Sequence, residues 1–273
     1  MTSILTNNSA MNALTTLRNI NNNLGTTQDR ISTGLKVASG KDNAAYFSIS
    51  STMKGDSGMI KSIDEGLALT KNAVSTGRLG AETVADLARQ FVERVAFAQG
   101  EGVDKEKVQL ELDALADNIR TIIDQSSFNG SSVVKGEAAI TAVTGISRDA
   151  TGAFGAPTTI TITPVDLNAI HTALDGIDVD ADPAAALTAA EAQLTAAVDA
   201  ATSLGVAEKA IETQQSFLGE LAKRLDSGIG SMIDADMEEE AARLQALQVQ
   251  QQLATQALSI ANQGPQNILS LFR

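Results

Sequence analysis

The chain has 273 residues, with 33 acidic against 20 basic side chains and a formal net charge of −13. No basic stripe or tail stands out, which argues against binding to nucleic acid or to an anionic membrane surface. Cysteine is absent and histidine occurs once, which excludes disulfides, thiolate metal sites and multi-histidine metal centres. Aromatic residues make up only 3%, so we expect a thin aliphatic core of packed helices.

The sequence contains no obvious membrane or secretion signal. No stretch approaches the roughly 18 apolar residues that a membrane-spanning helix needs. Residues 1–8 carry neither a basic region nor an apolar run, so we expect no conventional secretory signal. On this evidence the protein either stays in the cytoplasm or leaves by a route that cuts no signal.

Apolar residues spaced alternately by three and four predict amphipathic helices in the N-terminal half. The first stripe weakens near Gly34 and Gly40, because glycine disfavours helix. A second stripe covers 53–95, about six heptads without proline. A third covers 108–122 and ends before an Asn129-Gly130 turn. The apolar positions of the first stripe are Leu14, Leu17, Leu24, Ile31 and Leu35.

Residues 131–182 differ from the rest, because the helical period disappears and glycine, threonine and β-branched residues increase. Residues 158–163 alternate polar and apolar side chains with a period of two, as a strand does. Residues 139–144 show a weaker version of the same pattern. We therefore predict a β-hairpin in a mid-chain insert.

The C-terminal part returns to helical spacing. Asp182 and Pro183 are a favoured helix start, with aspartate as N-cap and proline in the first turn. One stripe then covers 187–232, and a last one covers 244–272 after an acidic stretch. The predicted fold is mainly α, with long antiparallel coiled-coil-like helices from both chain ends and the hairpin between them.

The two terminal stripes are rich in asparagine, glutamine and threonine, and an isolated helix of this kind is marginally stable. One copy of each end makes at best a two-helix hairpin. We therefore infer that the ends order fully only when many copies pack together. The predicted division is a terminal coiled-coil core segment, 1–40 with 236–273, and a helical rod domain, 41–235.

Several short motifs stand in a set order and at set distances from both ends of the chain. Near the N-terminus these are Arg-Ile-Ser-Thr-Gly-Leu-Lys at 30–36 and Lys-Asp-Asn-Ala-Ala at 41–45. Phe-Asn-Gly at 128–130 and Asp-Ala-Asp at 234–236 follow, and the glutamine-rich final helix ends in leucines. These motifs resemble those of bacterial flagellins, and the chain is similar to a short flagellin without the large outer domains of longer ones.

This resemblance implies a structural protein that polymerises into the bacterial flagellar filament for swimming. The family's partners would be other copies of the chain, an export chaperone with the flagellar type III export apparatus, and the hook-associated and cap proteins. Its location would be extracellular, in the filament. We expect no catalytic residue, no metal site and no cofactor, and partners that include neither nucleic acid nor membrane.

Two groups of residues carry the predicted assembly function. We expect contacts between subunits at the apolar stripes of both ends. A charged cluster where the first helix weakens has two readings: a solvated loop, or a hinge or spoke that forms salt bridges with neighbouring subunits. The interface residues are Leu14, Leu17, Leu24, Ile31, Leu35, Leu244, Leu247, Leu258, Ile268 and Leu271, and the hinge or spoke residues are Arg30, Lys36, Lys41 and Asp42.

Two alternatives compete with the filament subunit. The first is a hook–filament junction protein, which caps rather than propagates; the dense terminal motifs favour the filament subunit. The second is an enzyme with a site in the insert around His171, although no known catalytic motif is present there. We expect His171 to be a solvated loop residue. The alternating Asp175, Asp178, Asp180 and Asp182 lack the glycine and glutamate of a calcium loop, so we expect a solvated acidic turn.

Overall fold

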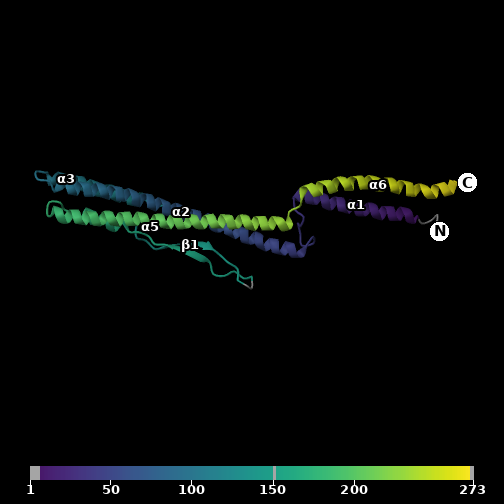
Figure 1. Ribbon diagram of the computed structural model, residues 1–273, viewed down its shortest axis with the longest axis horizontal. Helices are drawn as coiled ribbons and strands as arrows, with labels where there is room; N and C mark the ends of the chain where they lie inside the picture. Colours follow the sequence, from purple (N-terminus) through teal and green to yellow (C-terminus); the bar gives the residue numbers. More distant parts are fainter. Residues whose placement is uncertain (1–6, 150–151, 271–273) are drawn as a thin grey trace. The chain divides into compact units, whose positions relative to one another are not determined.

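The computed structural model describes residues 7–149 and 152–270, with side chains as far as residue 263. The fold is mainly α with a mid-chain hairpin, as predicted (Figure 1). The described elements are α1 (Asn8–Thr33), α2 (Ala44–Ala98), α3 (Lys105–Gln125), β1 (Ile140–Gly145), β2 (Thr158–Ile162), α4 (Leu167–Asp175), α5 (Pro183–Ile233) and α6 (Met237–Ser270).

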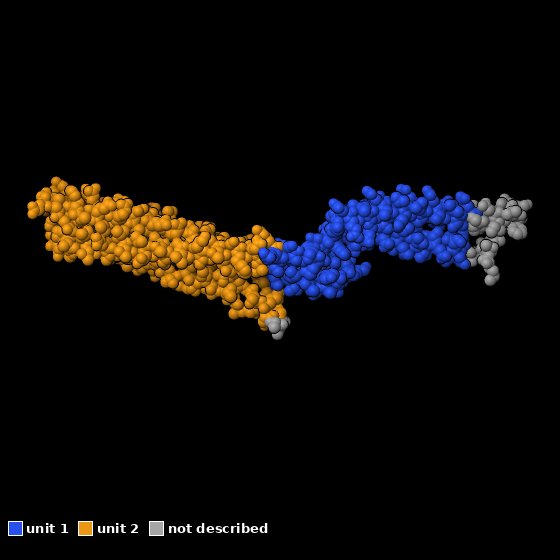
Figure 2. All heavy atoms as spheres, viewed as in Figure 1, with its two compact units in different colours: residues 1–56, 224–273 blue, residues 57–223 orange. Residues whose placement is uncertain are grey.

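The chain divides into two compact units, coloured separately in Figure 2. Unit 1 contains residues 1–56 and 224–273, and unit 2 contains residues 57–223. The first turns of α2 and the last turns of α5 therefore belong to unit 1. The division at residues 40 and 235 follows the ends of the terminal segments instead, and it stays a prediction.

Polar side chains at the helix starts explain where the helices begin. Asn7 caps α1 by accepting a hydrogen bond from the amide of Ala10, and Asp104 caps α3 in the same way. Asp182 accepts hydrogen bonds from the amides of Ala184 (3.0 Å) and Ala185 (3.1 Å). This confirms the predicted start of α5 at Pro183, where the missing N–H costs nothing.

Unit 2 is built around one aliphatic core to which α2, α3, α5 and the insert all contribute. Phe91 is the largest of its fully buried side chains. Each such side chain contributes about 1.5–3 kcal/mol relative to leaving it in water. The α2 part of the core follows the predicted stripe: Leu67, Val74, Ala81, Val84, Ala88, Phe91 and Val95.

Two glycines let the segment after α3 lie directly against α2. A Cβ at Gly77 would come within 2.1 Å of Val133 Cγ2, and one at Gly80 within 2.1 Å of Ser126 Oγ. Real Cβ atoms essentially never come so close, so a larger residue at either position would force its neighbour to move. The turn that precedes Val133 has Asn129 and Gly130 at positive φ, as the Asn-Gly pair predicted.

The insert begins with the predicted hairpin. Strands β1 and β2 pair antiparallel, with Ile140 opposite Ile162 and a bulge between Val143 and Gly145. The side-chain amide of Gln214 in α5 donates a hydrogen bond to the carbonyl oxygen of Thr144 (2.8 Å). This bond fastens the outer edge of β1 to the long helix.

The prediction that 131–182 lacks helix is wrong at α4. Asp166 caps this nine-residue helix, and Leu167, Ile170 and Leu174 are buried against the core. Two turns of helix are too short for a periodic stripe to stand out among threonines and alanines. His171 therefore lies on a helix and is half-buried, rather than in the predicted solvated loop.

Candidate functional site

The terminal helices α1 and α6 lie side by side and antiparallel within unit 1 (Figure 1). Polar contacts join them at three levels. The Asn7 side-chain amide donates to the carbonyl oxygen of Ala261 (2.8 Å), and the Gln251 amide donates to Asn21 Oδ1 (2.7 Å). Arg30 Nη1 contacts Glu240 Oε1 at 3.0 Å. These contacts define the register of the two helices, which apolar spacing alone does not.

The predicted interface residues mostly line the seam between α1 and α6. Leu247 is buried, Leu14 is 38% exposed, and Leu35 lies beyond the end of α1 in a small internal cluster. Ile268 falls on the described backbone of α6, and Leu271 lies outside the described residues. Their contact with a second copy stays a prediction. The half-buried members are Leu17, Leu24, Ile31, Leu35, Leu244 and Leu258.

A second apolar stripe, which the sequence analysis missed, faces away from the seam. Val249, Leu253 and Ile260 on α6 are 56%, 59% and 70% exposed, and Met11 on α1 is 61% exposed. At 100° per residue the three α6 residues fall within about 40° of one another, so they form one face. We call these three residues the outer stripe. Their spacing of four and seven is the signal that could have revealed it.

Short backbone contacts tie the two ends of the chain together where α1 stops. Gly34 ends α1 at a φ of 72°, a left-handed conformation that favours glycine. The amide of Lys36 then donates to the carbonyl oxygen of Ile233 (2.7 Å), and the amide of Ala235 donates to that of Gly34 (2.9 Å). We call residues 30–43 with 233–240 the junction. Val37, Ile229 and Ile233 form a small core beside it.

The four predicted hinge or spoke residues all lie at the junction, but they are used differently. Arg30 is partly buried and pairs with Glu240, whose side chain is 6% exposed. Asp42 accepts hydrogen bonds from the amides of Ala38 and Ser39 and from the Ser39 hydroxyl. These bonds, the hydroxyl foremost, hold the pKa of Asp42 below its ordinary value.

The other two, Lys36 and Lys41, are exposed, and their ammonium groups contact no partner in the described part of the chain. A cavity of about 320 Å³ opens at the junction, with Arg30, Lys36, Asp42 and Tyr46 in its lining. The structure therefore brings three of the four predicted residues to one surface, and Lys41 stands beside it in the same loop.

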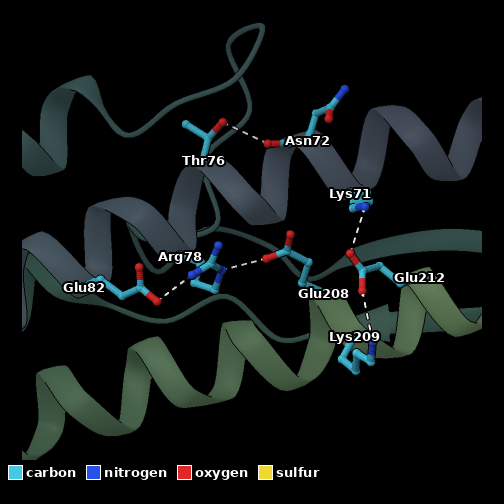
Figure 3. Close-up of polar contacts among 8 residues, drawn as sticks. All are labelled: Lys71, Asn72, Thr76, Arg78, Glu82, Glu208, Lys209 and Glu212. Carbon is cyan, nitrogen blue, oxygen red and sulfur yellow. Dashed lines mark hydrogen bonds and ion pairs between the residues drawn. The ribbon is translucent and has the colours of Figure 1, made fainter.

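Ion pairs in unit 2 connect α2 to α5 across a groove (Figure 3). Arg78 Nε contacts Glu208 Oε2 at 2.6 Å, and its guanidinium also pairs with Glu82. The hydrogen bonds that Arg78 donates to Glu208 and then to Glu82 raise the pKa of Arg78. The groove has a volume of about 740 Å³, and Gly205 lies on its wall within reach of Arg78.

A second set of ion pairs between α2 and α5 lies beside the first (Figure 3). Lys71 Nζ contacts Glu212 Oε1 at 2.9 Å, and Lys209 contacts the other oxygen of the same carboxylate at 3.3 Å. The bond from Lys71, followed by that from Lys209, lowers the pKa of Glu212. Alternating charges of this kind match α2 to α5 in register.

The polar residues of the insert serve its backbone. Asp178 accepts a hydrogen bond from the amide of Asp180, and Asp182 caps α5. Asp175 and Asp180 are exposed. Across 7–149 and 152–270, no group of three or more histidine, aspartate or glutamate side chains is arranged to hold a metal ion.

Comparison with known families decides what these helices belong to. The model of the bacterial flagellin N-terminal helical region matches residues 4–139, and that of the C-terminal helical region matches residues 187–272. The chain belongs to the bacterial flagellin family. The two matches include all of α1, α2, α3 and α6 and nearly all of α5, and they leave out most of the insert.

Curated flagellins match this flagellin along its whole length. It is 36% identical over 282 residues to a flagellin of Brucella melitensis, with all of both chains covered. It is 35% identical over 322 residues to flagellin C of Rhizobium meliloti, again with all of both chains covered. A flagellin of Caulobacter vibrioides is 31% identical over 277 residues, with 100% of this chain and 99% of that one covered.

A solved structure supports the fold of this flagellin. A protein described as a flagellar hook-associated protein of Vibrio parahaemolyticus matches with a TM-score of 0.53 at 14% identity, covering 71% of this chain and all of that one. At that identity the likeness shows the fold alone. Among the described helices of this flagellin, none is both long and apolar enough to cross a membrane.

Proposed function

We propose that this flagellin is a structural subunit that polymerises into the bacterial flagellar filament. The observation that carries the proposal is the outer stripe, which leaves Val249, Leu253 and Ile260 exposed although α6 already packs on α1. A helix face this apolar needs a covering partner, and in a homopolymer the partner is another copy. The half-buried leucines of the seam can contribute to the same contacts.

The structure also suggests why polymerisation would order the terminal helices further. Of the 26 residues of α1, only Thr27 is buried. Most of the stability of a helix comes from packing its apolar face, so α1 gains little within one copy. Packing of many copies would add the missing burial, and assembly would then stabilise the ends.

We further propose the partners and location that the family implies. The subunit would be exported through the flagellar type III apparatus with a dedicated chaperone and would meet the hook-associated and cap proteins outside the cell. Its role would be structural, since polymerisation needs no bond-breaking chemistry. The junction would act as the hinge or spoke between the terminal segment, 1–40 with 236–273, and the rod, 41–235.

The hook–filament junction protein is the second candidate, because the matched hook-associated protein has the same type of fold. A filament subunit elongates its own seeds, whereas a junction protein binds only at an end. Seeded assembly of the purified chain, followed by negative-stain electron microscopy, separates the two. Long filaments are the expected result, and decoration of seed ends alone would favour the junction protein.

Substitutions in the outer stripe test whether this surface carries the contact between copies. Leu253→Ser with Ile260→Ser should abolish elongation while the monomer keeps its helical circular dichroism. The matched control is Val206→Ser with Leu110→Ser, which removes apolar side chains of similar exposure (66% and 68%) from unit 2. If the natural chain does not elongate seeds at all, the proposal that it polymerises fails. If the two double variants elongate equally well, the outer stripe is not the contact surface.

A further inference from the structure

The junction carries opposite charges that find no partner among the described residues. Lys36 and Lys41 are exposed on the loop after α1, and Glu238 and Glu239 are exposed in the first turn of α6. None of these four side chains makes an ion pair or a hydrogen bond within residues 7–149 and 152–270. Their neighbours Arg30 and Glu240, by contrast, bind each other at 3.0 Å.

Helix geometry explains why the two acidic side chains stay unpaired. Glu240 and Leu247 are seven residues apart, both are buried, and so they mark the face of α6 that meets α1. Each residue turns a helix by about 100°, so Glu239 and Glu238 point about 100° and 200° away from that face. Their carboxylates therefore project outward while Glu240 serves the seam.

The basic loop is held in place as firmly as the acidic turn. The amides of Lys36 and Val37 both donate to the carbonyl oxygen of Ile233, and the Val37 side chain is buried. Asp42 binds the backbone of Ala38 and Ser39, which fixes the loop around Lys41. Two fixed surfaces of opposite charge lose little entropy when they meet, so both are prepared for a contact.

A second copy of this chain is the partner that fits both surfaces. Each copy in a helical polymer contacts its neighbours through two different surfaces, so a basic and an acidic surface of the same chain can meet. A chain with a net charge of −13 repels its own copies, and contacts of opposite charge offset that repulsion. Resting on the proposed filament function, we propose that Lys36 and Lys41 of one copy pair with Glu238 and Glu239 of its neighbour.

Charge reversal tests the pairing in the full chain. Lys36→Glu with Lys41→Glu should slow seeded elongation about tenfold or more at low salt, since close charge pairs dominate association rates. Adding Glu238→Lys and Glu239→Lys to the same chain should restore elongation. The control is Lys54→Glu with Lys105→Glu, which adds the same negative charge at two lysines without partners in the described residues and should leave elongation nearly unchanged.

Engineered cysteines test the contact directly, because the natural chain has none. One chain carries Lys41→Cys and another carries Glu238→Cys. Long Lys and Glu side chains can pair across a Cα separation greater than the roughly 7 Å limit of a disulfide, so filaments grown from the mixture are treated with a short bismaleimide cross-linker. They should give cross-linked dimers, and the unassembled mixture should give almost none. Because each chain has one thiol, a dimer joining the two kinds of chain cannot come from contacts within one copy.

The outcomes separate this inference from the proposed function. If the natural chain forms no filaments, the proposed function fails. If it forms filaments, the inference is overturned by any of three results: reversal at 36 and 41 has no more effect than the control, the fourfold variant stays inactive, or mixed filaments give no dimers. Circular dichroism of each monomer checks that lysines in the first turn of α6 have not unfolded that helix.

Discussion

Helices α3 and α1 show how differently the two units treat the same sequence pattern. In unit 2, α3 has 21 residues, and five of them, at spacings of three and four, are buried in the core. In unit 1, α1 has 26 residues with a similar apolar stripe, and one of them, a threonine, is buried. The pattern predicts a helix and its apolar face. It does not say how much of that face the same chain will cover.

The largest loss of stability is expected from a substitution in the core of unit 2. Phe91→Ala removes a side chain that is 1% exposed and should lower the free energy of unfolding by about 3–5 kcal/mol. Leu14→Ala in α1, where the leucine is 38% exposed, should cost the monomer less than about 0.5 kcal/mol. Denaturant unfolding of the two variants measures the difference. Equal losses would mean that the terminal helices are as well packed as the core.

Glycine-to-alanine substitutions should have opposite signs in the two units. A Cβ at Gly77 in α2 would come within 2.1 Å of Val133, so Gly77→Ala should destabilise by about 1–3 kcal/mol. A Cβ added at Gly25 in α1 would meet no described atom within 4 Å apart from its own stretch of helix, and alanine should stabilise the helix by about 1 kcal/mol. Thermal unfolding monitored at 222 nm, the usual helical wavelength, reports both. A loss of stability at Gly25→Ala would reveal a packed neighbour there.

Ion pairs should matter more at the seam than on the surface. Glu240→Gln leaves the partly buried Arg30 without its carboxylate and should cost about 1–3 kcal/mol in the α1–α6 hairpin. Glu93→Gln removes a partner of Arg89 that is 63% exposed and should change stability by about 0–1 kcal/mol. Hydrogen exchange of amides in α1 and in α2 measures each effect locally. If Glu93→Gln accelerated exchange in α2 more than Glu240→Gln accelerated it in α1, the expected order of the two ion pairs would be reversed.

The smallest expected effect is a pH dependence of the junction loop. The folded state lowers the pKa of Asp42, so its bonds to Ala38 and Ser39 are present above the unfolded pKa and are lost as pH falls through the folded one. Asp42→Asn should therefore loosen the loop at pH 7 and make no difference once the pH lies below the folded pKa of Asp42. Amide chemical shifts of Ser39 follow this. A difference between the two chains that persists in acid would point to another cause.

The long elements were predictable because their spacing repeats many times. The stripe in α2 continues through six heptads, and its buried residues fall where the sequence predicted them. Short or local features were harder. In α3 the buried position near the end is Ile123 rather than Ile122, a shift of one residue that periodicity cannot resolve. Helix α4 was missed because two turns give too few repeats.

The sequence predicted where the candidate site lies but not which of its residues bind within the chain. Sequence placed Arg30, Lys36, Lys41 and Asp42 in one cluster, and the junction contains all four. Only side-chain contacts show that Arg30 and Asp42 are engaged within the chain, whereas the two lysines have no partner among the described residues. The outer stripe was missed for a related reason, since α6 has two apolar faces and the seam uses just one.

The backbone contacts at the junction have a consequence for how the chain ends find each other. Leu35 and Asp234 form an isolated antiparallel bridge, although the whole of unit 2 separates them in the sequence. Closing so large a loop costs entropy, and once the bridge holds the two segments together, bringing α1 to α6 closes only a short loop. With the bridge formed, α1 and α6 become the two arms of one helical hairpin. Their ordering becomes a local, fast event that can start at the junction and run outward to the chain ends.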